Sequence, residues 1–236
     1  MTKIILNIPH SQTVFPGNSM DQWDNIDTLK NDMSIWTDHY AHELFVWGAE
    51  TLDVIPVVYQ YSRYYCDVER LIDDPLDAVG RGIIYTKLAS DDGERKVSAE
   101  ERAGIMSEYR AYHEHITELL EDGAMLIDCH SFSQFLAEDV DICIGFNEDR
   151  TKPADQLLGL IENHFREWGY RVAFNKPYSN SLAPGSQHSY TSFMIEANKH
   201  LYLEDDLSKG PFFYKVNGSI IDLYKKLGDH QQSSHS

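Results

Sequence analysis

Ala124-Met-Leu-Ile-Asp128-Cys-His130-Ser131 joins a short apolar run to an acid, a thiol, an imidazole and a hydroxyl. The apolar run predicts a buried strand, and open α/β sheets bind their ligands at the carboxyl ends of strands. The segment Ile4-Ile-Leu-Asn-Ile-Pro-His10-Ser11 has the same layout. We therefore expect the imidazoles of His10 and His130 at one edge of one sheet, which is an arrangement typical of a metal site.

The sequence around this stretch alternates between strand and helix patterns. We expect strands over 4–8, 54–59, 124–127, 140–145, 170–174 and 191–195, and helices over 26–49, from the capping box Ser98-Ala-Glu-Glu101 to Gly123, over 153–169 and over 211–227. This alternation predicts an α/β protein with a mostly parallel sheet. Pro56 cannot donate a ladder hydrogen bond, so its strand is predicted at an edge or in an irregular position.

The chain shows no internal repeat and no clear linker, so we expect one catalytic domain over residues 1–230 and a disordered tail over 231–236. Its 236 residues are enough to bury roughly 70–75% of the unfolded surface without disulfides or structural metals.

The charge balance and the cysteines limit the environment and the partners. The chain carries 20 basic and 38 acidic residues, a net charge of −18, and this field repels nucleic acid. No apolar run reaches the length of a membrane span, and the first residues lack a signal-peptide pattern. Three cysteines without CxxC spacing indicate a reducing compartment. We expect a cytoplasmic protein with no nucleic-acid or membrane partner and an unknown oligomeric state.

Strand geometry separates Cys129 from its two neighbours, Asp128 and His130. Neighbouring residues on a strand point to opposite faces, so Cys129 is predicted to be a buried small hydrophobe and not a nucleophile. Asp128 and His130 share a face if the strand continues, and a carboxylate there can orient a metal-binding imidazole. The alternative is that Asp128 caps the following turn.

Glu196 follows the apolar strand 191–195 and is the third polar group at a strand end. A glutamate beside a metal-bound water can act as general base and then protonate the leaving amine. The alternative is a salt bridge to Lys199 or Arg70.

Further candidates have ordinary explanations as well as functional ones. Asp38 and His42 stand four apart and would share one helix face, where a surface pair is the ordinary explanation. Asp38 also precedes a buried helix face, where a carboxylate needs a partner such as a cation. Arg63 and Arg70 can bind a substrate carboxylate or an oxyanion, or can pair with nearby acids. His113 lies in an apolar helix stripe, where a core histidine is the usual interpretation.

The loop Asn175-Lys-Pro-Tyr178-Ser-Asn180-Ser-Leu-Ala-Pro-Gly185 is rich in turn-forming residues. It is suited to form a substrate wall or lid, and the alternative is a plain surface loop.

These pieces occur in an order that resembles the N-formylglutamate amidohydrolase family over roughly residues 4–203. The motifs that carry the resemblance are Ile8-Pro-His-Ser11, Ser62-Arg-Tyr with Asp67-Val-Glu-Arg70, Tyr112-His113, Ile127-Asp-Cys-His-Ser131, Asp141-Ile-Cys-Ile-Gly145, Asn175-Lys-Pro-Tyr178, and Ile195-Glu-Ala-Asn198 with Leu201-Tyr202.

The resemblance implies a three-layer α/β/α fold with a mixed sheet, similar to the zinc carboxypeptidases. It also implies a metal-dependent amidohydrolase that cleaves an N-acyl amino acid, with N-formylglutamate giving formate and glutamate. The cofactor implied is a divalent metal, zinc first, although manganese or iron suits a two-histidine, one-carboxylate set nearly as well.

The resemblance also implies roles for individual residues. By position, His10, His130 and Asp38 are expected to bind the metal, and Glu196 is expected to be the general base. The other expected site residues are Arg63 and Arg70 near the reacting amide, Asp128 and Asp67 supporting the ligands, and Tyr178, Asn180 and His113 at the substrate.

The sequence departs from the family pattern on the substrate side. Glu69 stands where the family has an amide, Lys199 stands where it has arginine, and Ser179-Asn180 replaces a glycine pair. A carboxylate beside Arg70 would repel an anionic substrate or neutralise that arginine. The alternatives are therefore an N-acyl-amino-acid or small-peptide amidase of different specificity, or a binding protein that has kept the pocket without turnover.

Overall fold

The computed structural model describes residues 3–90 and 92–233. The chain divides into two compact units made of interleaved segments. The first unit takes in the chain up to Ile8, residues 40–58 and the chain from residue 119 onward, and the second takes in residues 9–39 and 59–118. The single domain predicted over residues 1–230 stays a prediction.

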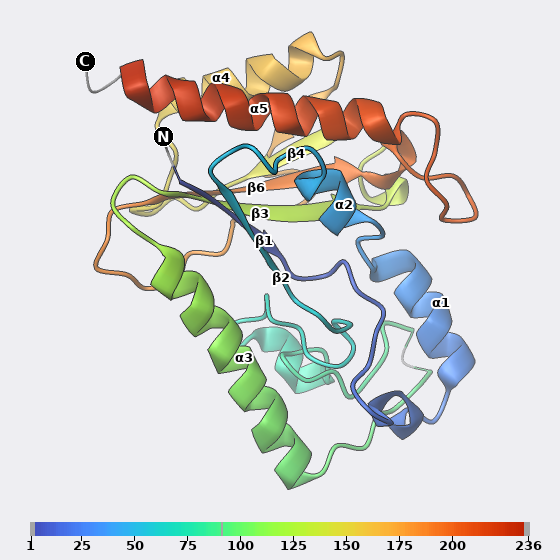
Figure 1. Ribbon diagram of the computed structural model, residues 1–236. Coiled ribbons are helices and arrows are strands. Elements are labelled where there is room, and N and C mark those ends of the chain that lie inside the picture. The colour runs from blue at the N-terminus through green and yellow to red at the C-terminus, as the bar shows by residue number, and fades with distance from the viewer. Residues whose placement is uncertain (1–2, 91, 234–236) are drawn as a thin grey trace. The chain divides into compact units, whose positions relative to one another are not determined.

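The first unit is built on one sheet. Within the described residues it has six strands in the order β2-β1-β3-β6-β4-β5 (Figure 1). Their bounds are β1 Ile4–Ile8, β2 Val54–Val58, β3 Met125–Phe132, β4 Ile142–Gly145, β5 Val172–Phe174 and β6 Thr191–Asn198. Neighbouring strands run parallel except for β4 and β6. The α/β fold with a mostly parallel mixed sheet is confirmed, and β2 is an edge strand as Pro56 predicted.

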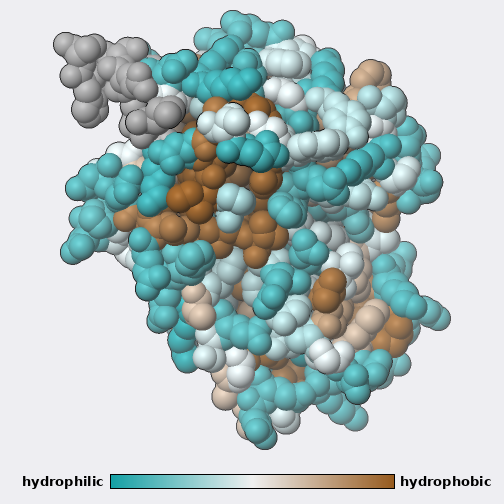
Figure 2. Space-filling view, viewed as in Figure 1, coloured by the Kyte–Doolittle hydropathy of each residue, from teal (hydrophilic) through white to brown (hydrophobic). Residues whose placement is uncertain are grey.

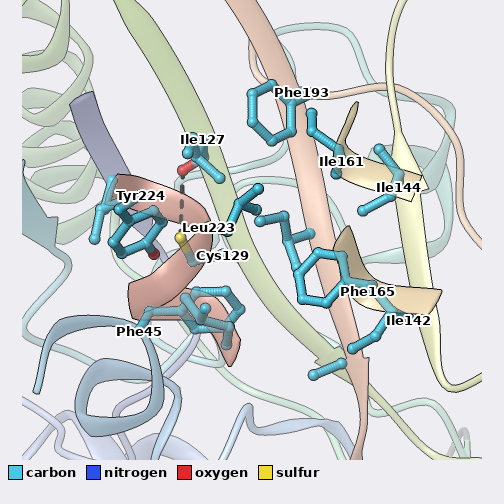
Figure 3. Packing of buried hydrophobic residues seen from close by; sticks show 14 of the residues in the cluster. Phe45, Ile127, Cys129, Ile142, Ile144, Ile161, Phe165, Phe193, Leu223 and Tyr224 are labelled. Atoms are coloured by element: carbon cyan, nitrogen blue, oxygen red, sulfur yellow. Dashed lines mark hydrogen bonds between the residues drawn. The ribbon is translucent and has the colours of Figure 1, made fainter. Parts of the chain in front are cut away.

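Three helices of the first unit, α2 (Ala41–Val46), α4 (Asp155–Glu167) and α5 (Phe213–Ser233), pack on one face of this sheet. Figure 3 shows Ile127 and Cys129 of β3 against Phe45, Phe165 and Tyr224 from the three helices. The prediction that Cys129 is a buried hydrophobe is confirmed. Its thiol is fully buried and donates to the Ile127 carbonyl at 3.4 Å, and burial raises the pKa of Cys129 well above its usual value.

The opposite face of the sheet carries polar side chains. Successive residues of a strand alternate between faces, and the apolar positions of β1, β3 and β6 that belong to the helix-covered core are alternate ones. The positions between them include Asn7, Asp128, His130 and Glu196, and all four are buried. Strand alternation thus separates the packing residues from the polar ones.

The edge of the sheet at β2 is apolar. Figure 2 shows mostly hydrophilic residues on the face drawn, with hydrophobic residues gathered over β2. Val54, Ile55 and Val58 are partly exposed there, and Pro56 is exposed. Proline removes one backbone donor and so weakens this edge as a template for further strands.

The second unit contains helix α1 (Ile26–Trp36), nearly all of α3 (Ala99–Leu119) and the short 3₁₀ helices η1 (Ser19–Gln22) and η2 (Pro75–Val79). One cluster of buried hydrophobic residues in this unit is made of Trp23, Leu29, Met33, Tyr64, Tyr85 and Leu88. The capping box before α3 is confirmed, because Ser98 and Glu101 each accept the other's backbone N–H.

The single helix predicted over 26–49 is wrong. The chain leaves the helix after Trp36, Thr37 is extended, and Tyr40 opens α2 from a left-handed conformation with φ of 59°. The break coincides with a tertiary bond, since the Asp38 backbone N–H donates to the His10 carbonyl at 3.0 Å. Asp38 and His42 therefore do not share a helix face.

Two strand ends also differ from the prediction. β3 continues to Phe132 and β6 to Asn198, so His130 and Glu196 lie inside strands and not just beyond them. The strands extend because eight consecutive residues pair between β3 and β6.

Helix α5 runs to Ser233 and so includes the first part of the predicted tail, while residues 234–236 lie outside the described residues. Among the described helices, none combines the length and the apolar character needed to cross a bilayer.

Candidate active site

Asp67 is the centre of a charged cluster in the second unit. Its carboxylate is fully buried. Oδ1 lies 2.7 Å from His10 Nε2, and Oδ2 accepts from Arg63 Nη2 at 2.8 Å. Arg70 Nε is 3.5 Å from Oδ2, and the Glu69 backbone N–H donates to Oδ1 at 3.2 Å. One carboxylate therefore fixes an imidazole and contacts two guanidinium groups.

Asp67 and Arg63 each stabilise the charged form of the other. Burial by itself would raise the pKa of Asp67, but the positive charge of Arg63, the His10 contact and Arg70 outweigh burial and hold that pKa well below its usual range. Burial would likewise lower the pKa of Arg63, and the Asp67 carboxylate raises it instead. Both side chains are therefore charged as a buried pair. The alternative of pairing with nearby acids, and not only with a substrate, therefore holds for Arg70 and extends to Arg63.

His10 presents its second ring nitrogen to two further carboxylates. Because Asp67 engages Nε2, the nitrogen left for a metal is Nδ1. Nδ1 lies 3.5 Å from Glu69 Oε2 and 3.9 Å from Asp38 Oδ2, and ligand atoms of His10, Asp67 and Glu69 all lie within 4.8 Å of one another. His10 and Asp38 are nearly completely buried. An imidazole nitrogen with carboxylate oxygens is a donor set that suits a divalent ion such as zinc.

Two residues of α3 hold the loop that carries this cluster. His113 Nε2 lies 2.7 Å from the Val68 carbonyl, and the Tyr109 hydroxyl donates to the Arg70 carbonyl at 2.8 Å. Burial lowers the pKa of His113 despite that bond, so the ring favours its neutral form. His113 thus supports the segment between Asp67 and Arg70, and substrate binding by His113 stays a prediction.

The polar face of the first unit pairs an imidazole with a carboxylate. His130 on β3 is the register partner of Glu196 on β6, and partners on adjacent strands of one sheet lie about 4.8 Å apart. Cys143 on β4 is the register partner of Glu196 on its other side. Glu196 is therefore the middle residue of a row across three strands.

Asp128 connects β3 to β1 and to the loop that contains Leu182. Its carboxylate accepts from the Asn7 side-chain amide on β1 and from the Leu182 backbone N–H. Asp128 is fully buried, so both acceptor oxygens are used inside the protein. Asn7 was not among the predicted residues, although a lone polar side chain in an apolar strand was the signal for it.

The loop at 175–190 crosses the same face. Leu182 bonds to Asp128, the Ser192 hydroxyl donates to the Leu182 carbonyl at 2.6 Å, and the Cys143 thiol donates to the Tyr178 carbonyl at 3.3 Å. Tyr178 is 38% exposed, and Asn180 is exposed in a left-handed conformation. The loop bonds to the sheet through its backbone and leaves these two side chains exposed; the substrate wall stays a prediction.

The predicted residues thus fall into two groups. The second unit brings together His10, Asp38, Asp67, Arg63 and Arg70, and the first unit brings together Asp128, His130 and Glu196. Within the first unit, β1 is the strand that precedes His10 in the chain. β1 in turn pairs with β3, with Asn7 opposite Asp128.

Solved structures share this fold. N-formylglutamate amidohydrolase from Ralstonia eutropha JMP134 superposes with a TM-score of 0.81 at 19% identity, covering 99% of this chain and 95% of that one. The gene product Atu2144 from Agrobacterium tumefaciens has a TM-score of 0.68 at 16% identity, with 100% and 92% covered. No curated protein sequence matches the chain.

The family is shown by sequence. The family model for N-formylglutamate amidohydrolase matches residues 2–203, which is most of the chain. The protein belongs to the N-formylglutamate amidohydrolase family, and it is a hydrolase of that class. The resemblance inferred from the motifs is confirmed.

Proposed function

We propose that this protein is a metal-dependent amidohydrolase that cleaves the amide bond of an N-acyl amino acid of the N-formylglutamate type and releases formate. The observation that carries the proposal is the pairing of His130 with Glu196 on the polar face of the sheet. This pairing sets a metal-binding side chain beside a carboxylate that can act as a base. Family membership supports the same chemistry.

We assign His10, Asp38 and His130 as the protein ligands. The assignment rests on donor chemistry and on the path of the chain, since β1 and β3 are neighbouring parallel strands and each leads to one of the histidines. A catalytic zinc site typically has three such ligands and an open position. Zinc is the first choice, and manganese or iron suits the same donors.

A divalent ion held by His10, Asp38 and His130 would polarise the attacking water and lower its pKa towards neutrality. Glu196 takes the proton from the attacking water, the water oxygen bonds to the formyl carbon, and the C–N bond breaks. Glu196 then delivers the proton to the departing amine nitrogen, which gives formate and a free amino acid. Asp67 holds the His10 ring through Nε2, and Asp128 fixes β3 near His130.

Arg63 and Arg70 are the cationic groups available to the substrate in the second unit. Both contact Asp67, so part of their charge is already compensated. This observation favours, as a second candidate, an amidase of the same mechanism whose substrate side chain is not an acid. Tyr178 and Asn180 are the proposed wall of the substrate site. The buried free cysteines Cys66, Cys129 and Cys143 support a reducing, cytoplasmic setting.

The test is hydrolysis by metal-loaded protein of N-formylglutamate and of a panel of other N-formyl and N-acetyl amino acids. Glu196→Gln should lower kcat by about 10²–10⁴-fold while bound metal stays at the wild-type level. The matched control is Glu100→Gln, which makes the same charge change at an exposed position of α3. Full activity in Glu196→Gln would remove the base from the mechanism. A wild-type protein that hydrolyses no member of the panel would support the non-catalytic binding alternative.

A further inference from the structure

Two rows of register partners run side by side across β3, β6 and β4. The first row is made of His130, Glu196 and Cys143, and the second of Asp128, Met194 and Gly145. The rows stand two residues apart along each strand, so they share one face of the sheet and lie roughly 7 Å from each other. A segment fixed on the second row therefore borders the row that contains the proposed base Glu196.

The loop segment 178–182 lies on the second row. The Leu182 N–H donates to the Asp128 carboxylate on β3. The Asn180 carbonyl approaches Gly145 on β4 so closely that a Cβ on this glycine would lie 2.5 Å from the carbonyl oxygen. The segment thus crosses the polar face of the sheet from β4 to β3, directly beside the first row.

Asn147, in the connection between β4 and α4, holds the middle of this segment. Its side-chain amide donates to the Ser181 carbonyl at 2.9 Å and to Ser181 Oγ at 3.3 Å. Ser181 stands between Asn180 and Leu182, the two residues that contact the second row. Asn147 is partly buried and comes two residues after Gly145, so the end of β4 fixes its position.

Other side chains hold the rest of the loop. The Ser192 hydroxyl donates to the Leu182 carbonyl at 2.6 Å. Arg150 Nη2 and the Tyr190 hydroxyl both donate to the Pro184 carbonyl, at 3.3 Å and 2.6 Å. Because these bonds hold the loop beyond Ser181, replacing Asn147 should loosen the segment 178–182 without unfolding the whole loop.

We infer that Asn147 is a positioning residue of the substrate site, which holds the proposed wall residues Tyr178 and Asn180 beside Glu196 and thereby sets substrate affinity. This inference rests on the proposed function. Asn147 acts through the loop and not on the reacting bond, so its loss should weaken binding of the ground state and of the transition state alike. The kinetic signature of such a role is a raised KM with kcat retained.

The experiment replaces Asn147 with leucine, which keeps a similar shape, removes the donor and adds no charge near the substrate. Loss of one hydrogen bond corresponds to a factor of up to about 10. We therefore expect KM of the metal-loaded enzyme to rise about 10-fold for the panel member that wild type hydrolyses fastest, with kcat within about twofold of wild type. Hydrogen exchange of the backbone amides at 178–182, measured by mass spectrometry on metal-free protein, should be about 10-fold faster.

Two further variants serve as controls. Asn163→Leu makes the same change at an exposed position of α4 and should match wild type in both measurements. Asn147→Gln keeps an amide donor and should recover part of the lost affinity. If Asn147→Leu does not fold by circular dichroism, Asn147→Ala takes its place under the same criteria.

The outcomes separate this inference from the proposed function. Unchanged hydrogen exchange at 178–182 in the folded Asn147 variant would overturn the inference, whatever Glu196→Gln shows. A lower kcat with an unchanged KM would also overturn it, because a smaller folded fraction produces that result. If wild-type protein hydrolyses no member of the panel, the proposed function fails and the inference falls with it, whereas either of the first two results leaves the proposed function standing.

Discussion

Replacing Asp67 with asparagine removes the negative charge at the centre of the cluster in the second unit. The carboxylate has no exposed surface, and its two oxygens serve His10, Arg63 and the Glu69 N–H. Asparagine has the same shape but only one acceptor oxygen. If its amide nitrogen faces Arg63, donor is set against donor; if it faces His10 instead, the buried guanidinium keeps an acceptor but loses its counter-charge.

The size of the effect follows from burial. The Arg63 side chain is 15% exposed, so the substitution leaves a mostly buried cation without its main counter-charge. Breaking a buried pair from one side destabilises a protein by about 3–5 kcal/mol. For a chain of this length each kcal/mol lowers Tm by roughly 2–4 °C, so Asp67→Asn should lower Tm by roughly 6–20 °C.

The measurements are urea denaturation and thermal unfolding of metal-free protein at neutral pH, both followed by fluorescence and circular dichroism. Asp205→Asn, at an exposed position, is the control and should stay within about 0.5 kcal/mol of wild type. Adding Arg63→Met to Asp67→Asn should cost less than the sum of the two single changes, because the unpaired cation is gone. A loss below about 1 kcal/mol in Asp67→Asn would refute the reasoning that this charge is needed where it lies.

Two other changes test the first unit. Gly145→Ala would put a methyl group 2.5 Å from the Asn180 carbonyl oxygen. Because backbone atoms cannot move aside as a flexible side chain can, we expect the free energy of unfolding from urea denaturation to fall by about 1–3 kcal/mol. An unchanged denaturation midpoint would contradict the close approach of the loop to β4. Burial raises the pKa of Asp141, but hydrogen bonds and the charge of Arg171 outweigh burial and lower it. Its contribution is therefore complete above an unfolded pKa of about 3.9 and lost as pH falls through the lower folded pKa. Arg171 is half exposed, so Asp141→Asn should lose only about 1 kcal/mol at neutral pH, and a stability gap from wild type that persisted at about pH 2 would be evidence against this pairing.

The fold was largely predictable because its signals are local. Apolar alternation and turn residues identify β1, β3 and β6 without any knowledge of their neighbours, and Pro56 identifies β2 as an edge. Strand geometry alone separated Cys129 from His130, and the structure confirms that separation. The failure in the first helix comes from a long-range contact that local signals cannot show. The helix predicted across Asp38 has good periodicity, but a hydrogen bond to the distant His10 carbonyl competes with it.

The sequence by itself determined the family, the mostly parallel sheet, and the two strands with which His130 and Glu196 are associated. These features follow from side-chain periodicity and from the order of the motifs, and both can be read along the sequence without knowledge of any tertiary contact. Only the tertiary structure decided the relation of His10 to Asp67 and Glu69, which stand 57 and 59 positions further along the chain. No spacing rule links residues so far apart. Their contact is set by where a buried carboxylate finds its charged partners, which only the folded chain brings together.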